Sequence, residues 1–118
     1  MGDLIYLAAP YSHRPESVRH HRYMIATIAA ADLTLRGYAI FSPITHSHNM
    51  ARICDLPSNW AFWERIDRTF LSRCSELWVL TIEGWKTSTG VLAEIKIAEE
   101  LGLPVKYLDP VSLEEVFA

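Results

Sequence analysis

The sequence predicts a small α/β domain in three layers, with a parallel sheet of four to five strands flanked by helices. The chain has 118 residues, of which 50% are hydrophobic and 21% charged, a balance typical of one globular domain. Short apolar runs alternate with longer stretches of helical spacing, the order that gives parallel strands joined by right-handed crossovers. The apolar runs are continuous, as in strands that are covered on both faces. We therefore expect a single domain over residues 1–118.

In the first half of the chain we expect two strands, one helix and a long loop. The apolar run LIYLAA is too short for a helix and is followed by a proline, which indicates a buried strand. The next segment has helical spacing, with Pro15 where a first helical turn accepts proline and Gly37 after its end. The expected elements are a strand over residues 4–9, a helix over 15–36, a strand over 38–42 and a loop over 43–58. A loop of that length in a small domain is often functional.

In the second half we expect two strands and three helices. Ser58 or Asn59 can cap the first of these helices, and Gly102 ends the second. The expected elements are a helix from 59 to 73, a strand over 77–82, a helix over 89–101, a strand over 105–108 and a short helix over 112–117. Ligands bind at the carboxyl ends of the strands in such sheets. The expected site therefore involves residues 8–17, 43–58 and 83–90.

The distribution of charge favours a small anionic ligand over a nucleic acid. The formal net charge is −3, whereas a general nucleic-acid binder is usually basic overall. All eight arginines and all five histidines nevertheless lie at or before Arg73, and eight acids and only three lysines follow from Glu76 onward. A local arginine and histidine cluster fits a small anion, although scattered charge on a solvated surface is the alternative.

The sequence also indicates the cellular compartment in which the protein is expected. Two cysteines, Cys54 and Cys74, are too few for a disulfide scaffold, so we expect reduced thiols. No apolar run approaches the ~18 residues of a membrane span, and an acid stands near the start where a signal peptide carries positive charge. We expect a cytoplasmic protein that does not bind membranes.

Two carboxylates fall on the apolar sides of predicted helices. Projected at ~100° per residue, Asp67 lies in the middle of an apolar face. That face comprises Trp60, Trp63, Ile66, Phe70, Leu71 and Cys74. Glu94 lies on the flank of the buried stripe of its helix. An unpaired buried carboxylate costs several kcal/mol, so each must have a partner, be protonated or open onto a cavity. A paired core aspartate and an ordinary flank glutamate are the structural alternatives. As a functional pair, they could act as nucleophile, general acid or general base, as in glycoside cleavage.

Motifs along nearly the whole chain resemble those of the nucleoside 2-deoxyribosyltransferase superfamily. The segment STGVLAEIKIAEELGLPV resembles its signature at Gly90, Glu94, Ala98, Gly102, Pro104 and Val105. The start IYLAAPYS resembles the first strand of the superfamily, with Ala9 in place of a glycine, and ERIDRTFLSRCSELWVL resembles its helix that carries an aspartate. The chain is most similar to a small branch of unknown function. The resemblance implies a flavodoxin-like or Rossmann-like sheet and no cofactor.

The resemblance also implies roles for several residues. Glu94 would be the nucleophile on the anomeric carbon, Asp67 would hold the sugar or share protons, and Tyr6 would orient Glu94. Ser88 stands where transferases of free nucleosides carry an aspartate and where the similar deoxynucleoside 5′-monophosphate N-hydrolases carry a phosphate-binding serine. This favours cleavage of the N-glycosidic bond of a nucleoside 5′-monophosphate. Base exchange by a deoxyribosyltransferase, a non-catalytic nucleotide-binding module and a structural oligomer are the alternatives, and an ordinary helix cap is the alternative role of Ser88.

The remaining candidates are ligand contacts. A helix start with nearby arginines favours an anion. The expected phosphate contacts are Ser12, His13, Arg14, Ser17, Arg19, Ser88 and Gly90. His46 and His48 form an HxH pair, for which we expect substrate contact or loop capping and not a metal. Three tryptophans, Trp60, Trp63 and Trp85, could stack on a base or bury against a second subunit. His20, His21 and Arg22 are expected on a solvated face. Because members of the superfamily usually complete their site with a neighbouring subunit, we expect a homo-oligomer, a dimer or tetramer.

Overall fold

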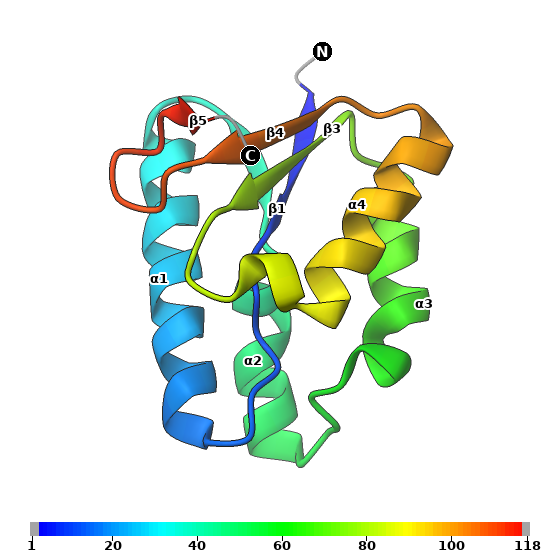
Figure 1. Cartoon of the computed structure of the whole chain (residues 1–118). Coiled ribbons are helices and arrows are strands. Elements are labelled where there is room, and N and C mark those ends of the chain that lie inside the picture. The colour runs from blue at the N-terminus through cyan, green and yellow to red at the C-terminus, as the bar shows by residue number, and fades with distance from the viewer. Residues whose placement is uncertain (1–2, 117–118) are drawn as a thin grey trace.

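A five-stranded sheet in the order β2-β1-β3-β4-β5 organises the chain, and the computed structural model describes residues 3–116 (Figure 1). The strands are β1 (Leu4–Ala8), β2 (Ala39–Phe41), β3 (Glu76–Leu80), β4 (Val105–Leu108) and β5 (Glu115–Val116). The first four are parallel, and β5 pairs antiparallel with β4. The carboxyl ends of the parallel strands therefore meet at one edge, as expected. The predicted three-layer α/β class, Rossmann-like in its arrangement, is confirmed.

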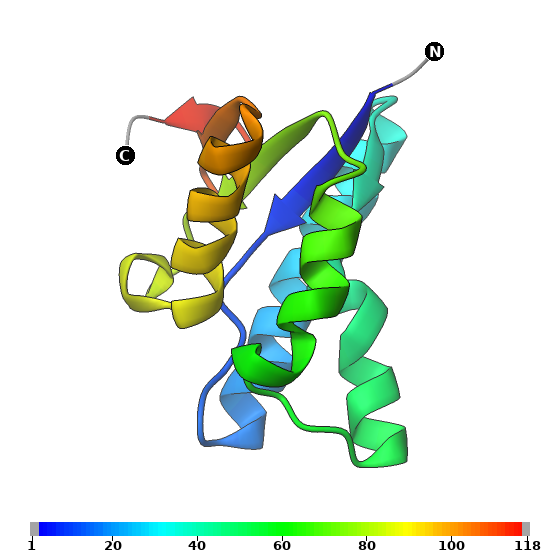
Figure 2. The same cartoon turned by 90° about the vertical axis from the view of Figure 1, so that its right-hand side faces the viewer.

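Helices cover both faces of this sheet. The helices are α1 (Glu16–Leu35), α2 (Pro43–Cys54), α3 (Trp60–Leu71) and α4 (Thr89–Leu101), with a short 3₁₀ turn η1 (Trp85–Thr87). Figure 2 shows α3 and α4 side by side on one face, whereas α1 and α2 lie on the other. No helix within residues 3–116 is long and apolar enough to cross a bilayer.

Two apolar cores result from the alternation of side chains along each strand. On β1, Ile5 and Leu7 pack toward α1, whereas Tyr6 and Ala8 pack toward α3 and α4. Tyr6 and Leu7 are both fully buried, so neither face of the central strand reaches solvent. Cys74 is a free, buried thiol in the second core, whereas Cys54 is a free, exposed thiol.

The expected loop over residues 43–58 is wrong, because most of this segment is helix α2. Ser42 caps the helix by accepting a hydrogen bond from the Thr45 N–H at 3.2 Å, and Pro43 occupies the first helical position. Both are known helix-start signals. The helix ends at Asp55, which adopts a left-handed conformation with φ of 55°.

The expected helix over residues 112–117 is also wrong within the described chain, which ends at residue 116; Phe117 lies outside it. The Asp109 carboxylate accepts hydrogen bonds from the Val111 and Ser112 N–H groups, and Leu113 has a positive φ of 61°. This turn reverses the chain, so that β5 pairs with β4 at the sheet edge.

Candidate functional site

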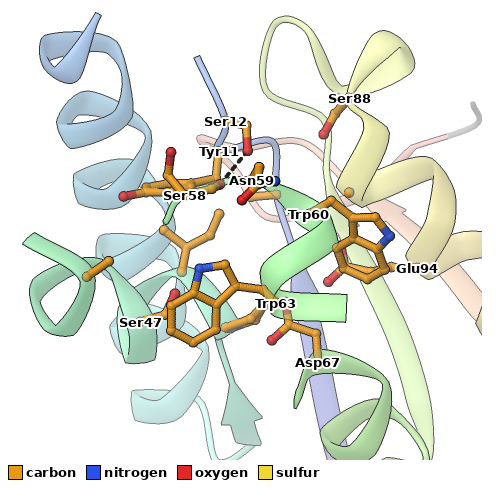
Figure 3. A pocket seen from close by; sticks show the side chains of 15 residues that line it. Tyr11, Ser12, Ser47, Ser58, Asn59, Trp60, Trp63, Asp67, Ser88 and Glu94 are labelled. Carbon is orange, nitrogen blue, oxygen red and sulfur yellow. Dashed lines mark hydrogen bonds between the residues drawn. The ribbon is translucent and has the colours of Figure 1, made fainter. Parts of the chain in front are cut away.

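A pocket lies at the carboxyl edge of the sheet, between the segments that follow β1, β2 and β3 (Figure 3). Tyr11 and Ser12 come from the β1–α1 loop, and Ser88 stands at the start of α4. The Ser12 hydroxyl donates to the Ser58 carbonyl at 2.7 Å, which ties the β1–α1 loop to the α2–α3 loop across the pocket. The site is thus built from segments far apart in the sequence, as expected for this topology.

Glu94 is the buried acid of this pocket. Its side chain is 5% exposed, and the Tyr6 hydroxyl donates a hydrogen bond to its carboxylate. Burial raises the pKa of Glu94 to about 8; the Tyr6 hydrogen bond opposes this rise and the nearby Asp67 charge adds to it. Burial also raises the pKa of Tyr6 well above its ordinary value, so Tyr6 remains a donor. Within residues 3–116, Tyr6 is the hydrogen-bond partner that orients Glu94.

Asp67 lines the same pocket from α3. Its side chain is partly buried, and burial raises its pKa to about 7. Because the two carboxyl groups interact, their protons leave in two steps that belong to the pair. Between pH 7 and pH 8 the pair therefore holds about one proton. The two carboxylates predicted to point inward thus line one pocket, and a shared catalytic site with defined chemical roles stays a prediction.

Two tryptophans form an apolar wall beside these acids (Figure 3). The Trp63 indole N–H donates to the Pro57 carbonyl at 2.7 Å, which fixes the ring against the α2–α3 loop. The Trp60 ring lies over Gly90, where an added Cβ would sit 3.6 Å from its Cε3 atom. Flat apolar surfaces of this kind suit an aromatic ring such as a base.

Ser88 caps α4, because its hydroxyl oxygen accepts a hydrogen bond from the Val91 N–H at 3.3 Å. The capping alternative is therefore what the structure shows. Ser88 also lines the pocket with Gly90, so a phosphate contact there stays a prediction.

The structure brings together only part of the predicted site. Ser12, Trp63, Asp67, Ser88, Gly90 and Glu94 line the pocket, and Tyr6 joins it through Glu94. His13, Arg14, Ser17, Arg19, His46, His48 and Trp85 do not line it. The Arg19 guanidinium instead donates to the backbone carbonyls of His13 and Arg14 and holds the β1–α1 loop in shape.

The aromatic and histidine candidates outside the pocket have structural contacts. His46 packs against Phe41 and Phe70, with ring centroids 5.7 and 5.6 Å away, and Trp85 packs against Tyr107. His46 and His48 lie two positions apart on a helix, so they point in different directions, and the loop expected for this segment is absent. Within residues 3–116 there is no cluster of three or more side chains that could hold a metal.

His48 belongs to a hydrogen-bonded row of side chains, Tyr11, His48 and His20, that the sequence analysis did not predict. It is 2% exposed; its Nδ1 lies 2.7 Å from the Tyr11 hydroxyl and its Nε2 lies 3.2 Å from His20 Nδ1. The ring also stacks on Tyr23, with centroids 4.3 Å apart. Burial lowers the pKa of His48, with the nearby positive charges adding to the effect. The sequence signal that could have indicated these contacts is the helix start at Ser42 and Pro43, which places His48 on a helix that packs against α1.

Arg22 was also misassigned. The expectation that it lies on a solvated face is wrong, because its side chain is half-buried and its guanidinium donates to the Ser12 carbonyl at 3.3 Å and the Glu83 carbonyl at 3.5 Å. It therefore joins the loops that follow β1 and β3, and Gly84 leaves the space that it occupies, since a Cβ there would lie 2.8 Å from its Nη2.

Comparison with known proteins adds a family and no activity. No curated protein matches this chain significantly. Residues 3–109 match a family model described as a domain of unknown function, DUF1937. The match covers β1 to β4 and all four helices, and hence both carboxylates of the pocket and Tyr6. Since the match spans most of the 118 residues, the chain belongs to the DUF1937 family, a domain of unknown function.

Proposed function

We propose that this protein cleaves the N-glycosidic bond of a nucleoside 5′-monophosphate or a related nucleotide, with Glu94 as the nucleophile. The observation that carries the proposal is a buried glutamate that a tyrosine orients within a pocket, with a second carboxyl group lining the same pocket. The resemblance to the nucleoside 2-deoxyribosyltransferase superfamily supports the same chemistry, and its link to the DUF1937 family is part of the proposal.

The pKa values of the two acids suit a shared-proton mechanism. Between pH 7 and pH 8 the shared proton lies mainly on Glu94, whose pKa is the higher of the two, so the productive form, with Glu94 ionised and Asp67 protonated, is the less populated of the two one-proton forms. A Glu94 oxygen attacks the anomeric carbon while the bond from that carbon to the base nitrogen breaks, and the leaving nitrogen takes the Asp67 proton. Water then attacks the same carbon, gives a proton to the Asp67 carboxylate and releases Glu94 as a carboxylate. The products are a free base and a sugar phosphate.

The hydrogen bond from Tyr6 has a defined part in this cycle. It stabilises the ionised form of Glu94, since it opposes the rise in the pKa of that group. It also fixes one carboxylate oxygen, which limits the orientations from which the group can attack. Tyr6 is thus a positioning residue for the nucleophile.

The proposed test is release of free base from a panel of ribo- and deoxyribonucleoside 5′-monophosphates and the matching nucleosides. Glu94→Gln keeps the shape of the side chain but forms no stable glycosyl ester, so turnover should fall at least ~10³-fold. Asp67→Asn removes the proton donor and acceptor but keeps the nucleophile, so it should cost less, about 10²-fold. Glu99→Gln, an exposed substitution on the same helix, is the matched control and should keep the wild-type rate.

Each outcome discriminates among the alternatives. A wild-type rate of base release in Glu94→Gln would contradict the role of Glu94 as the nucleophile. Transfer of the sugar to an added base, in place of hydrolysis, supports a deoxyribosyltransferase. Nucleotide binding without base release from any substrate supports a non-catalytic binding module.

We also propose a cytoplasmic homo-oligomer. The apolar side chains of Ile28 and Leu35 on α1 are 66% and 88% exposed, surface that a second subunit could cover. Free cysteines suit a reducing compartment. Sedimentation of the purified chain tests the oligomer, and a monomer at all concentrations would contradict it.

A further inference from the structure

A second cavity adjoins the first one, between the N-terminal turn of α1 and the C-terminal turn of α2. Its volume is about 150 Å³, against about 60 Å³ for the first cavity. Tyr11, Ala51 and Ser58 line both cavities, so the two are neighbours that share a wall. A ligand that reaches Glu94 at one end has room for a further group at the other.

The lining of this second cavity is strongly polar. Arg19 and Glu16 come from α1, Arg52 comes from α2, and Asp55 follows α2 directly. Within residues 3–116, no ion pair joins any of these four side chains to one another or to any other group. His48 adds a buried imidazole beside them. Two guanidinium groups thus line a cavity in which no carboxylate neutralises them by contact.

The two arginines differ in how much of their hydrogen-bonding capacity is used. Arg19 Nη1 donates to the carbonyls of His13 and Arg14 and its guanidinium also faces the Tyr11 hydroxyl, which leaves only part of its N–H groups for a ligand. Arg52 has no hydrogen bond within the described chain and is exposed at the cavity. A guanidinium is the side chain that binds carboxylate and phosphate oxygens in a two-pronged manner. Arg52 is therefore the principal candidate for binding an oxyanion.

The acids in the same cavity narrow the class of ligand. Glu16 and Asp55 bring the formal charge of the four groups to zero, so a bare polyanion would meet two carboxylates. Ionised carboxylates accept hydrogen bonds from hydroxyl groups. The lining thus fits one oxyanion on a group that carries hydroxyls, such as a phosphorylated sugar.

We propose that the second cavity is a subsite for a phosphate or carboxylate group borne by a hydroxylated ligand, with Arg52 and Arg19 as the residues that bind it. This assignment rests on the proposed function where it identifies the oxyanion as the 5′-phosphate of the substrate. It shares only Arg19 with the expected anion site, since Ser12, Ser88 and Gly90 line the first cavity and His13, Arg14 and Ser17 line neither.

The test uses inorganic phosphate and acetate as probes, with backbone amide shifts in NMR spectra as the readout. Phosphate should bind the wild-type protein saturably, with the largest shifts over residues 16–19 and 51–56. Arg52→Gln should weaken phosphate binding at least ~10-fold, and Arg52→Lys should weaken it less because it keeps the charge. Arg65→Gln, an exposed arginine on α3 that lines neither cavity, is the control and should bind as the wild type does. Tripolyphosphate should bind no more tightly than phosphate. Comparable binding of acetate would identify a carboxylate as an equal occupant of the subsite.

Several results would overturn this subsite. They are wild-type affinity in Arg52→Gln, shifts centred on residues 88–90, or much tighter binding of tripolyphosphate. Phosphate binding is measured without turnover, so the subsite and the proposed function can fail separately. If the protein releases base but Arg52→Gln binds phosphate as the wild type does, the subsite is contradicted and the proposed function is not. If phosphate binding depends on Arg52 but no base is released, the proposed function is contradicted and the subsite is not.

Discussion

Replacing Glu94 with glutamine should change the stability of the protein relative to the wild type in a way that depends on pH. The variant should gain stability over the wild type as the pH rises from 5 to 8. The side chain is 5% exposed, and burial raises its pKa from 4.5 to about 8. Between these two values the folded state binds more protons at this site than the unfolded state does. The free energy of unfolding of the wild type therefore falls as the pH rises through this window.

The magnitude follows from the size of this shift. Each pKa unit corresponds to about 1.4 kcal/mol, so the cost of ionising Glu94 in the folded state grows by about 3–4 kcal/mol between pH 5 and pH 8. Glutamine carries no such cost, but it buries an amide whose N–H groups need partners, at about 1–3 kcal/mol at every pH. The variant should thus be equal to or less stable than the wild type at pH 5 and more stable at pH 8.

Thermal and urea denaturation at pH 5, 6, 7 and 8 measure this difference. For a chain of this length about 1 kcal/mol shifts Tm by roughly 4 °C, so the gap between variant and wild type should change by roughly 12–16 °C over the range. Glu99→Gln, exposed on the same helix, should show no such trend. A gap that does not depend on pH would refute the reasoning that burial controls the ionisation of Glu94.

Three further outcomes are expected. In stopped assays over pH 5–10, kcat/KM for base release should follow a bell-shaped profile. Its apparent pKa values of about 7 and 8 belong to the pair of Glu94 and Asp67, and Asp67→Asn should remove one limb of the profile. Because burial lowers the pKa of His48 below 6.5, stability that is present above pH 6.5 should be lost as the pH falls, and His48→Gln should make this loss of Tm shallower. Gly84 has φ of 93°, so Gly84→Ala should cost about 1–2 kcal/mol in urea denaturation; Gly37→Ala, with φ of 102° and no atom within 4 Å of the added Cβ, measures the backbone part of that cost.

The parallel sheet could be predicted because its strands are short, continuous apolar runs that alternate with periodic helices. The segments around Leu7 and Val79 can only be buried, and their connections are long enough for helical crossovers. Helix α2 was missed because the polar run THSHN, with its two histidines, interrupts the apolar residues of the helix and leaves no long apolar stripe. β5 was missed because a strand of two residues leaves no periodic signal, and the turn at Asp109 that leads into it is local hydrogen bonding rather than an apolar pattern.

The candidate site was predictable where a charge conflicts with an apolar face. In helical projection Asp67 stands out in the middle of an apolar face, and Glu94 stands out less, on the flank of a buried stripe. The contacts of Arg22 and His48 could not be found in this way, since a polar residue on a helix with an irregular apolar face is equally compatible with solvent. Their partners are backbone carbonyls and a phenol from other segments, whose positions depend on the finished fold.

β1 and the loop after it link the two cavities. Tyr6 lies on the face of β1 that packs against α4 and donates to Glu94, whereas Tyr11 follows the strand and contacts His48 on α2. Because β1 pairs with a strand on each side and four of its five residues are buried, it holds Tyr6, and the start of the loop that carries Tyr11, in fixed positions. A ligand seated in both cavities would contact Tyr11 in the wall that they share. Tyr11→Phe should therefore weaken nucleotide binding through the loss of one hydroxyl while leaving the Tyr6 hydrogen bond to Glu94, and with it the alkaline stability trend, unchanged.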